Sequence, residues 1–225
     1  MIAGPMFAGK TEELLRRVHR ARLAGRRVSV VGHSLDDRGG ADRLSTHLGR
    51  SVPARMLGEP QPLLDLLDGD IAAGGEDSAP GDPAPGDLMP GDQASDAPTP
   101  HCPTPAGGVE LLALDEAQFF GPALVPVLER LLEAGIDVAV AGLCLTYDGG
   151  PFSPLPELMA RAEEVVKLTA VCTVCGADAA FHIRLVDDGA DALRATAAQV
   201  GGGESYRARC RAHRDPTLRE RRPLD

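Results

Sequence analysis

Residues 4–11 read Gly-Pro-Met-Phe-Ala-Gly-Lys-Thr and fit the pattern G-x-x-x-x-G-K-[ST], in which a glycine-rich loop leads directly into a helix. In such a loop the backbone N–H groups surround phosphate groups at the helix N-terminus. The lysine reaches the outer phosphate oxygens, and the hydroxyl ligates Mg²⁺. We therefore expect a phosphate loop made of eight residues: Gly4, Pro5, Met6, Phe7, Ala8, Gly9, Lys10 and Thr11.

Apolar residues beyond this loop follow first a helical and then a strand pattern. Residues 12–23 carry an approximately helical apolar stripe, which Gly25 should end. The stripe consists of Leu14, Leu15, Val18 and Leu23. Three apolar runs have the length of β-strands, namely 28–31, 111–114 and 138–141. Because a helical pattern at 121–134 falls between two of these runs, we expect an α/β fold with a mostly parallel sheet.

The strand that should precede the phosphate loop is very short in this sequence. Such a strand normally has about five residues, and only Met1, Ile2 and Ala3 stand before Gly4. A central strand satisfies the backbone groups of both neighbours, and each buried group left without a partner costs about 1 to 3 kcal/mol. We therefore expect the functional chain to begin several residues upstream with an apolar strand. The alternatives are that a short strand suffices, or that the chain is a decayed copy.

The apolar run 111–114 ends in two adjacent carboxylates, Asp115 and Glu116. The carboxyl ends of parallel strands meet at one edge of a sheet, beside the phosphate loop. There Asp115 would bind Mg²⁺ through water, and Glu116 would accept the proton of an attacking hydroxyl. An ordinary strand end could present the same pair, so the interpretation depends on its combination with the phosphate loop.

Four residues of the metal-binding type form two pairs with equal spacing in the last third of the chain. Two residues separate the members of each pair, and 34 residues separate the pairs. This spacing is typical of a structural zinc site with four ligands and no open position, although two unrelated pairs remain an alternative. The expected ligands are Cys172, Cys175, Cys210 and His213. We expect the metal to hold structure and to lie far from the chemistry.

The charge balance of the chain excludes some classes of function. The chain has 33 acidic and 23 basic residues and a net charge of −10, whereas proteins that bind nucleic acid carry clustered positive charge. No apolar run approaches the roughly 20 residues that a membrane-spanning helix needs, and the N-terminus has no signal-peptide pattern. We therefore expect a cytoplasmic protein that engages neither nucleic acid nor membrane.

Residues 76–107 differ in composition from the rest of the chain. They hold eight prolines, six acidic residues and no Lys or Arg, and Pro-Gly-Asp recurs at Pro80, Pro85 and Pro90. Such a composition cannot bury enough apolar surface to offset chain entropy. The segment is expected to be a disordered insertion that acts as a solvated linker, and a binding motif is the alternative.

Six motifs of this chain together resemble those of the zinc-bearing thymidine kinases, and they occur in the order found in that family. They are 4–11 (GPMFAGKT), 36–38 (DDR), 115–120 (DEAQFF), 149–152 (GGPF), 166–172 (VKLTAVC) and 201–206 (GGGESY). The resemblance implies a phosphate-loop kinase domain over 1–170, a zinc-bearing domain over 171–214 and a tail over 215–225. A lasso-like loop of the zinc-bearing domain would close over thymidine.

The activity that the resemblance implies is transfer of the γ-phosphate of ATP, bound with Mg²⁺, to the 5′-hydroxyl of thymidine. Glu116 matches the catalytic base of the family. Besides the phosphate loop, the implied ATP and Mg²⁺ site contains Asp36, Asp37, Arg38, Asp115, Glu116, Ala117 and Gln118. The implied thymidine site contains Met6, Phe119, Leu143, Tyr147, Phe152, Ala197, Ala198, Gln199, Val200, Gly201 and Tyr206. The resemblance also implies a homotetramer that thymidine triphosphate inhibits.

The chain departs from the family pattern at two positions near the implied thymidine site. Cys144 follows Leu143 where the family commonly has Asp, and His182 stands where a Thr usually lies near the thymine. Three alternatives stay open: a nucleotide-binding paralogue without turnover, a zinc-ribbon ATPase that handles nucleic acid, and a kinase that prefers deoxyuridine. A nucleic-acid-handling ATPase should be basic, and this chain is acidic.

Overall fold

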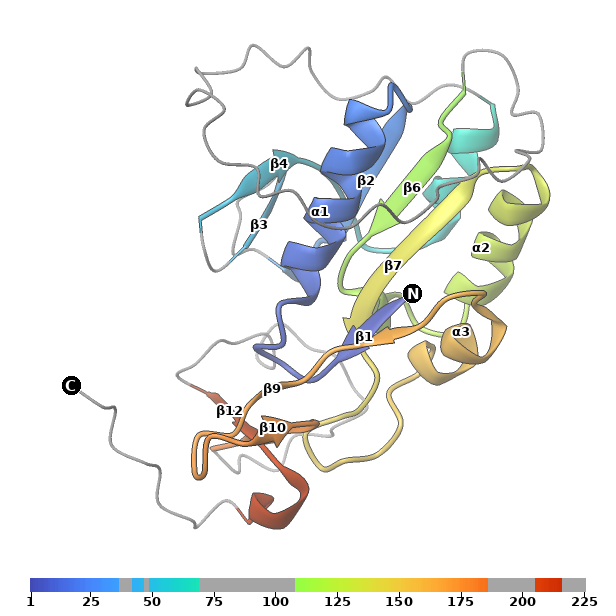
Figure 1. Cartoon of the computed structure of the whole chain (residues 1–225). Helices are drawn as coiled ribbons and strands as arrows, with labels where there is room; N and C mark the ends of the chain where they lie inside the picture. The colour runs from blue at the N-terminus through green and yellow to red at the C-terminus, as the bar shows by residue number, and fades with distance from the viewer. Residues whose placement is uncertain (37–41, 47–48, 69–107, 186–204, 216–225) are drawn as a thin grey trace, which may run out of the picture.

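The framework of the molecule is a six-stranded sheet in which all neighbouring strands run parallel (Figure 1). The computed structural model describes residues 1–36, 42–46, 49–68, 108–185 and 205–215. In order across the sheet the strands are β5 (Arg55–Leu57), β2 (Val28–His33), β6 (Leu111–Leu114), β7 (Asp137–Leu143), β1 (Ile2–Gly4) and β8 (Val166–Lys167). The α/β fold expected from the sequence is confirmed.

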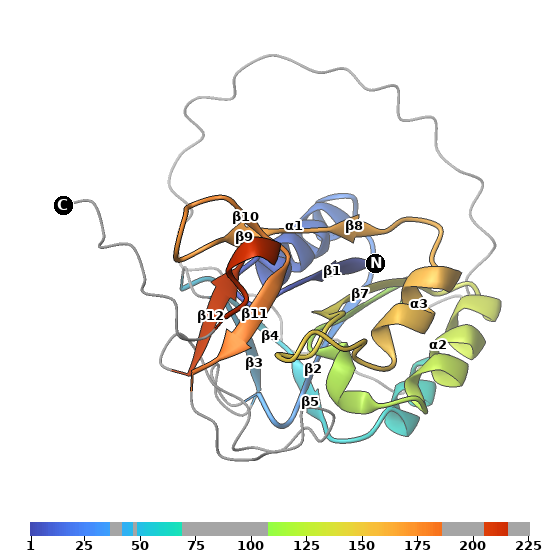
Figure 2. The ribbon, with the colours of Figure 1, turned by 90° about the horizontal axis from the view of Figure 1, so that it is seen from below.

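Helices cover both faces of this sheet, as Figures 1 and 2 show from two directions. Helix α1 (Lys10–Leu23) lies on one face. The other face packs against α2 (Leu124–Glu133), α3 (Leu155–Arg161) and the 3-10 helix η1 (Gln61–Leu67). Strand β6 illustrates the consequence, because Leu111 and Ala113 face α1 while Leu112 and Leu114 face α2. Both faces of the strand are buried, which explains its uninterrupted apolar sequence.

Helix α1 begins at Lys10, within the phosphate loop, and ends before Gly25, which has a φ of 74°. Its buried residues are Leu14, Leu15, Val18 and Ala21. The inclusion of Leu23 in the apolar stripe was wrong, since its side chain is 75% exposed. The helical repeat of 3.6 residues carries Ala21 onto the face of Val18 and turns Leu23 toward solvent.

Strand β1 has three residues, and it lies between β7 and β8. Ile2 and Ala3 are completely buried there. A glycine is required at the end of β1, because a Cβ atom on Gly4 would lie 2.7 Å from the backbone oxygen of Leu168. The first strand is as short as the sequence indicates, and the expectation of an upstream start stays a prediction.

Two antiparallel hairpins follow the main sheet and form a small module near its phosphate-loop edge (Figure 2). One pairs β9 (Ala170–Val171) with β10 (Asp178–Ala179), and the other pairs β11 (Phe181–Arg184) with β12 (Tyr206–Arg209). A short 3-10 helix, η4 (Arg211–His213), completes this module. A separate hairpin joins β3 (Arg43–Ser45) to β4 (Ser51–Pro53). Among the described residues, no helix is long and apolar enough to cross a membrane.

Candidate active site

The phosphate loop connects β1 to the N-terminus of α1. Phe7 and Gly9 have positive φ angles of 66° and 76°, and a positive φ is uncommon for a residue other than glycine. Such backbone outliers gather at ligand-binding turns, where the surrounding structure holds them. Within the loop, the Lys10 ammonium donates to the backbone oxygen of Pro5 at 2.8 Å. These contacts and dihedral angles define the shape of the loop.

Asp115 joins this loop to the end of β6, although β7 separates β6 from β1 in the sheet. The Thr11 hydroxyl donates to Asp115 Oδ2 at 2.7 Å. The other carboxylate oxygen of Asp115 accepts the backbone N–H of Glu116 at 2.9 Å. Asp115 itself is only 1% exposed. The two parts of the predicted nucleotide site thus meet at the carboxyl edge of the sheet.

Burial raises the pKa of the Asp115 carboxyl, and the adjacent Glu116 carboxylate raises it further, to about 7. The Thr11 hydroxyl, the backbone of Glu116 and the Lys10 charge act in the opposite direction. A divalent cation at this position would favour the ionised form, as an opposite charge within a few ångströms does. Near pH 7 the Asp115 carboxyl is therefore partly protonated, and a bound cation would displace that proton.

Glu116 occupies the turn that follows β6. Its φ of 53° and ψ of 39° place it in the left-handed region, directly before the 3-10 helix η2 (Ala117–Phe120). This conformation separates the two carboxylates, so that Asp115 is buried while Glu116 is only partly buried. The Gln118 amide donates to Glu116 Oε2 at 2.5 Å. Ala117, by contrast, is completely buried in the core between the sheet and α2.

His33 lies at the end of β2, beside these carboxylates, and the sequence analysis did not include it. Its Nδ1 accepts the N–H of Leu35 at 3.1 Å, and its Nε2 lies 3.2 Å from the backbone oxygen of Gly58. Burial lowers the pKa of His33, which favours the neutral ring. The signal that would have found it is its position, because the ends of β2 and β6 share one edge of the sheet.

The aromatic residues expected to bind a nucleoside fall into two groups. Phe119 contacts the His33 ring, with ring centres 5.5 Å apart, and lies edge-on to Phe152 at 6.5 Å. On the side of the small module, the Tyr206 ring is 6.0 Å from the ring of His182. Arg184 stacks over Tyr147, with 5.9 Å between the guanidinium carbon and the ring centre.

The remaining predicted site residues have varied surroundings. Leu143, at the end of β7, is 9% exposed, and its N–H donates to Gln118 at 2.9 Å. Asp36 is 6% exposed, and Met6 is partly buried in the phosphate loop. Seven predicted residues lie outside the described part of the chain: Asp37, Arg38, Ala197, Ala198, Gln199, Val200 and Gly201.

His182 projects from β11 toward the phosphate loop. Burial lowers its pKa to about 4, and the positive charge of Lys10 contributes in the same direction. The side chain is 3% exposed, and its Nδ1 atom has no hydrogen-bond partner among the described residues. The small module therefore reaches the neighbourhood of the lysine that would hold the outer phosphates.

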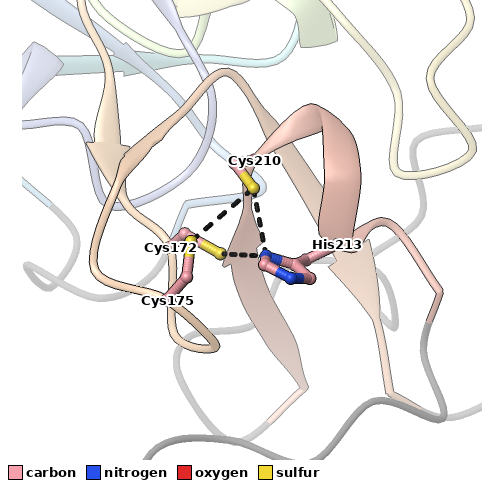
Figure 3. Close-up of side chains that lie close together, drawn as sticks. All are labelled: Cys172, Cys175, Cys210 and His213. Atoms are coloured by element: carbon pink, nitrogen blue, oxygen red, sulfur yellow. Dashed lines mark hydrogen bonds between the residues drawn. The ribbon is translucent and has the colours of Figure 1, made fainter.

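The four expected metal ligands come together in this module (Figure 3). Cys172 and Cys175 lie in the turn between β9 and β10, while Cys210 and His213 lie just after β12. All four ligand atoms are within 4.8 Å of one another, and the sulfur atoms of Cys175 and Cys210 are 3.8 Å apart. Zinc–sulfur bonds of about 2.3 Å in a tetrahedron imply sulfur–sulfur separations of about 3.8 Å. The geometry fits a structural zinc ion.

Electrostatics also favour a metal at this cluster. Burial alone would raise the pKa of the Cys172 thiol, but backbone groups of Cys210, Val174 and Cys175, together with His213, lower it to about 6. The thiolate is the form that ligates metals. These N–H groups stabilise negative charge on the sulfur, as the outer hydrogen bonds of a metal site do.

The small module that carries this cluster contacts the phosphate loop, and the expectation that the metal itself lies far from the chemistry stays a prediction. Ala8 of the phosphate loop packs against a small core that contains Cys172, Ala179 and Ala208. The register between distant strands decides this contact, and no local pattern encodes it. The core of the small module therefore packs against the phosphate loop.

Comparisons with known proteins agree with this arrangement. The sequence profile of the family described as "Thymidine kinase" matches residues 1–67 and 103–214. A protein named thymidine kinase from Deinococcus deserti is 40% identical over 213 residues, covering 95% of this chain and 92% of its own. Thymidine kinases from Deinococcus radiodurans and Haloquadratum walsbyi are 39% and 37% identical, each over 94% of this chain and over 87% and 92% of their own lengths. With a phosphate loop, paired carboxylates and a Cys/His cluster in one matching chain, this protein belongs to the thymidine kinase family.

Proposed function

We propose that this protein transfers the γ-phosphate of ATP to the 5′-hydroxyl of thymidine and produces thymidine monophosphate. The observation that carries the proposal is the hydrogen bond between Thr11 and Asp115, which unites the phosphate loop with the carboxylates that follow β6. The names of the related proteins support thymidine as the acceptor.

Nucleotide binding falls to the phosphate loop and the carboxylates. Backbone N–H groups at the start of α1 hold the phosphates, and Lys10 exchanges its contact with Pro5 for the outer phosphate oxygens. Thr11 and Asp115 would hold the Mg²⁺ that accompanies ATP, and the ion would supply neutralisation of charge on the phosphate oxygens. Asp36, together with Asp37 and Arg38, completes the proposed nucleotide site, whereas Ala117 is buried in the core and is left out of it.

Glu116 acts as the general base in this proposal. Its carboxylate is partly exposed at the edge of the sheet, next to the phosphate loop, where an attacking hydroxyl would arrive. A positioned base of this kind typically accelerates a reaction about 10²- to 10⁴-fold. It accepts the proton of the 5′-hydroxyl as the oxygen attacks the phosphorus.

Thymidine would lie between the aromatic groups of the two parts of the molecule. Met6, Phe119, Leu143 and Phe152 would form the side toward the sheet, and Tyr147 and Tyr206 the side toward the small module. Residues 197–201 would close over the base as a lasso. We propose residues 1–170 as the kinase domain, 171–214 as the zinc-bearing domain and 215–225 as a tail.

The zinc ion in this proposal is structural, with all four ligands supplied by Cys172, Cys175, Cys210 and His213. The phosphotransferase would be a cytoplasmic homotetramer that thymidine triphosphate inhibits. This inhibitor combines the nucleoside of one substrate with a triphosphate group like that of the other.

The deciding experiment measures ADP release by the purified protein with MgATP and a panel of nucleosides. We expect release that depends on thymidine, with deoxyuridine second and purine nucleosides inactive. Tight ATP binding without nucleoside-dependent release would instead indicate a nucleotide-binding paralogue. A preference for deoxyuridine would be traced to Cys144 or His182, the two departures from the family pattern.

A further inference from the structure

We propose that Gln118 is a positioning residue that holds the carboxylate of Glu116 for catalysis by tying it to the end of β7. This inference rests on the proposed function, in which Glu116 is the base. The resemblance assigned Gln118 to the ATP and Mg²⁺ site, and the geometry points to a different role.

The side chain of Gln118 links the turn after β6 to the end of β7. Its Nε2 donates to Glu116 Oε2 at 2.5 Å, and its Oε1 accepts the N–H of Leu143 at 2.9 Å across 25 residues of sequence. Leu143 is the last residue of β7, which pairs with both β6 and β1. The Gln118 amide therefore fixes the Glu116 side chain, which lies on a turn, relative to the centre of the sheet.

An amide in this place is poorly suited to bind a metal. Gln118 is 2% exposed, and the oxygen that a cation would require already accepts a backbone N–H. The nitrogen donates to Oε2 of Glu116. The amide nitrogen and the amide oxygen of Gln118 thus both form hydrogen bonds within the protein.

The glycine before Leu143 provides the space for this amide. A Cβ atom on Gly142 would lie 2.7 Å from Gln118 Oε1 and 3.1 Å from a methyl group of Leu155. Leu155 is completely buried, so it cannot yield to the extra atom. Any side chain at position 142 would push the amide away from Glu116.

Glu116 requires such support because of its backbone. It lies in the left-handed region at a turn, where its own strand no longer restrains the side chain. A base must stay within hydrogen-bond reach of the proton that it removes. Displacement of a reacting group by about 1 Å can cost about 100-fold in rate.

The test replaces Gln118 by Leu, which has a similar volume and makes neither hydrogen bond. We expect kcat at saturating MgATP and thymidine to fall about 10- to 100-fold, while both KM values change less than about twofold. The melting temperature, measured in parallel, separates this effect from unfolding. A purely structural role would lower the melting temperature and leave kcat of the folded protein unchanged, and that result would overturn the inference.

Gln118→Glu gives a signature that no structural role predicts. At low pH the introduced carboxyl is protonated and still donates to Glu116, whereas at higher pH two carboxylates face each other and repel. Other charged or titratable groups that act here include Asp115 on the same turn, His33 on β2 and Lys10 on α1, and β7 contributes the backbone N–H of Leu143. We expect kcat of this variant to decline as pH rises through a range in which the wild-type rate holds.

Gly142→Ala provides an independent variant that leaves Gln118 in place. It should lower kcat in the same way as Gln118→Leu. The matched control is Gly32→Ala in β2, whose new Cβ meets only the flexible Met56 and Leu44 on the opposite face of the sheet. Equal losses of kcat in the two alanine variants would refute the steric argument.

The outcomes also separate this inference from the proposed function. An inactive wild-type protein would count against the proposed function. An active wild-type protein with a fully active Gln118→Leu variant would count against this inference alone.

Discussion

Asp115 and Glu116 are adjacent in sequence, yet their surroundings differ. Asp115 is buried and accepts hydrogen bonds from Thr11 and from the backbone of Glu116. Glu116 turns away from the strand through its positive φ and is partly buried. The first carboxylate is therefore suited to hold a cation, and the second is suited to exchange a proton with a substrate.

The role of Glu116 predicts that Glu116→Gln abolishes turnover and leaves ATP binding nearly intact. The amide keeps the shape of the side chain and cannot accept the 5′-hydroxyl proton, so kcat should fall about 10²- to 10⁴-fold. The matched control is Glu110→Gln at the opposite end of β6, where the Glu110 side chain accepts the N–H of Arg27. If Glu116→Gln retained more than about a tenth of kcat, the base would be a different residue.

The raised pKa of Asp115 predicts proton release when the Mg²⁺–nucleotide complex binds. Its pKa is about 7 in the folded protein against an ordinary value of 3.8, so the folded state holds a proton that the unfolded state has lost between these values. The contribution of Asp115 to stability is thus present below about pH 4 and declines as pH rises toward 7. Calorimetry near pH 7 in buffers of different ionisation enthalpy should detect the released proton.

Asp115→Asn provides the control for that measurement. The amide cannot release a proton, so the binding enthalpy should no longer depend on the buffer. A wild-type enthalpy that is equal in all buffers would contradict the assignment of Asp115 as the displaced acid.

At the scale of elements, the small module and the main sheet share an interface at the phosphate loop. Ala8 packs into the core of the module, and Leu168, just before β9, closely approaches Gly4. On the other side, Arg214 stacks on Phe181 and donates to the backbone oxygen of Asp148 at 2.7 Å. The module that holds the Cys/His cluster therefore contacts both the phosphate loop and the loop of Tyr147.

This interface predicts that the protein holds one zinc ion per chain and that zinc removal weakens ATP binding. The metal organises the turn that contains Cys172, and that residue belongs to the core against which Ala8 packs. Elemental analysis should give one zinc per chain, and ATP titration of chelated protein should give a Kd raised several-fold. Cys175→Ser should reproduce both effects.

Cys144→Ala is the matched control for the zinc prediction, because Cys144 is buried in the core of the sheet, away from the Cys/His cluster. This variant should keep its zinc and its ATP affinity. Well under half a zinc per chain in the wild-type protein would count against the site. Unchanged ATP affinity in zinc-free protein would count against the coupling to the phosphate loop.

At the scale of the whole molecule, the candidate site residues lie at one edge of the sheet, and the hydrophobic core residues pack on both of its faces. The strand ends that carry His33, Asp115 and Leu143 lie side by side there, because β2, β6 and β7 are neighbours. The match to the thymidine kinase family is interrupted between residues 67 and 103, which largely coincides with the proline-rich segment 76–107. That segment therefore stands outside the pattern shared by the family.

We predict that deletion of residues 76–107, with a short Gly-Ser linker in their place, leaves kcat and folding largely unchanged. The entropy of closing a loop varies with the logarithm of its length, so the stability should shift by about 1 kcal/mol or less. Thermal unfolding and the thymidine kinase assay on the same preparation provide the measurement. A large fall in the melting temperature would mean that the segment packs on the core.

Local features of this protein were readable from the sequence because their physical causes are local. The phosphate loop, the strand that ends in Asp115, and the two chelating pairs each depend on residues within a few positions of one another. Periodicity likewise predicted α1 and the alternation of helices with parallel strands. The inclusion of Leu23 in the apolar stripe did not follow that periodicity, since the 3.6-residue repeat places Leu23 opposite Leu14 on α1.

Only the tertiary structure decided which distant groups meet. The hydrogen bond from Leu143 to Gln118 spans 25 residues, and Ala8 packs against a core whose residues lie more than 160 positions further along the chain. His33 became part of the site because β2 is the neighbour of β6. The order of strands in a sheet results from the packing of both faces at once, and no short stretch of sequence contains that information. The residues that carry the chemistry could therefore be predicted from local motifs. The contacts that hold these residues in place depend on the tertiary fold.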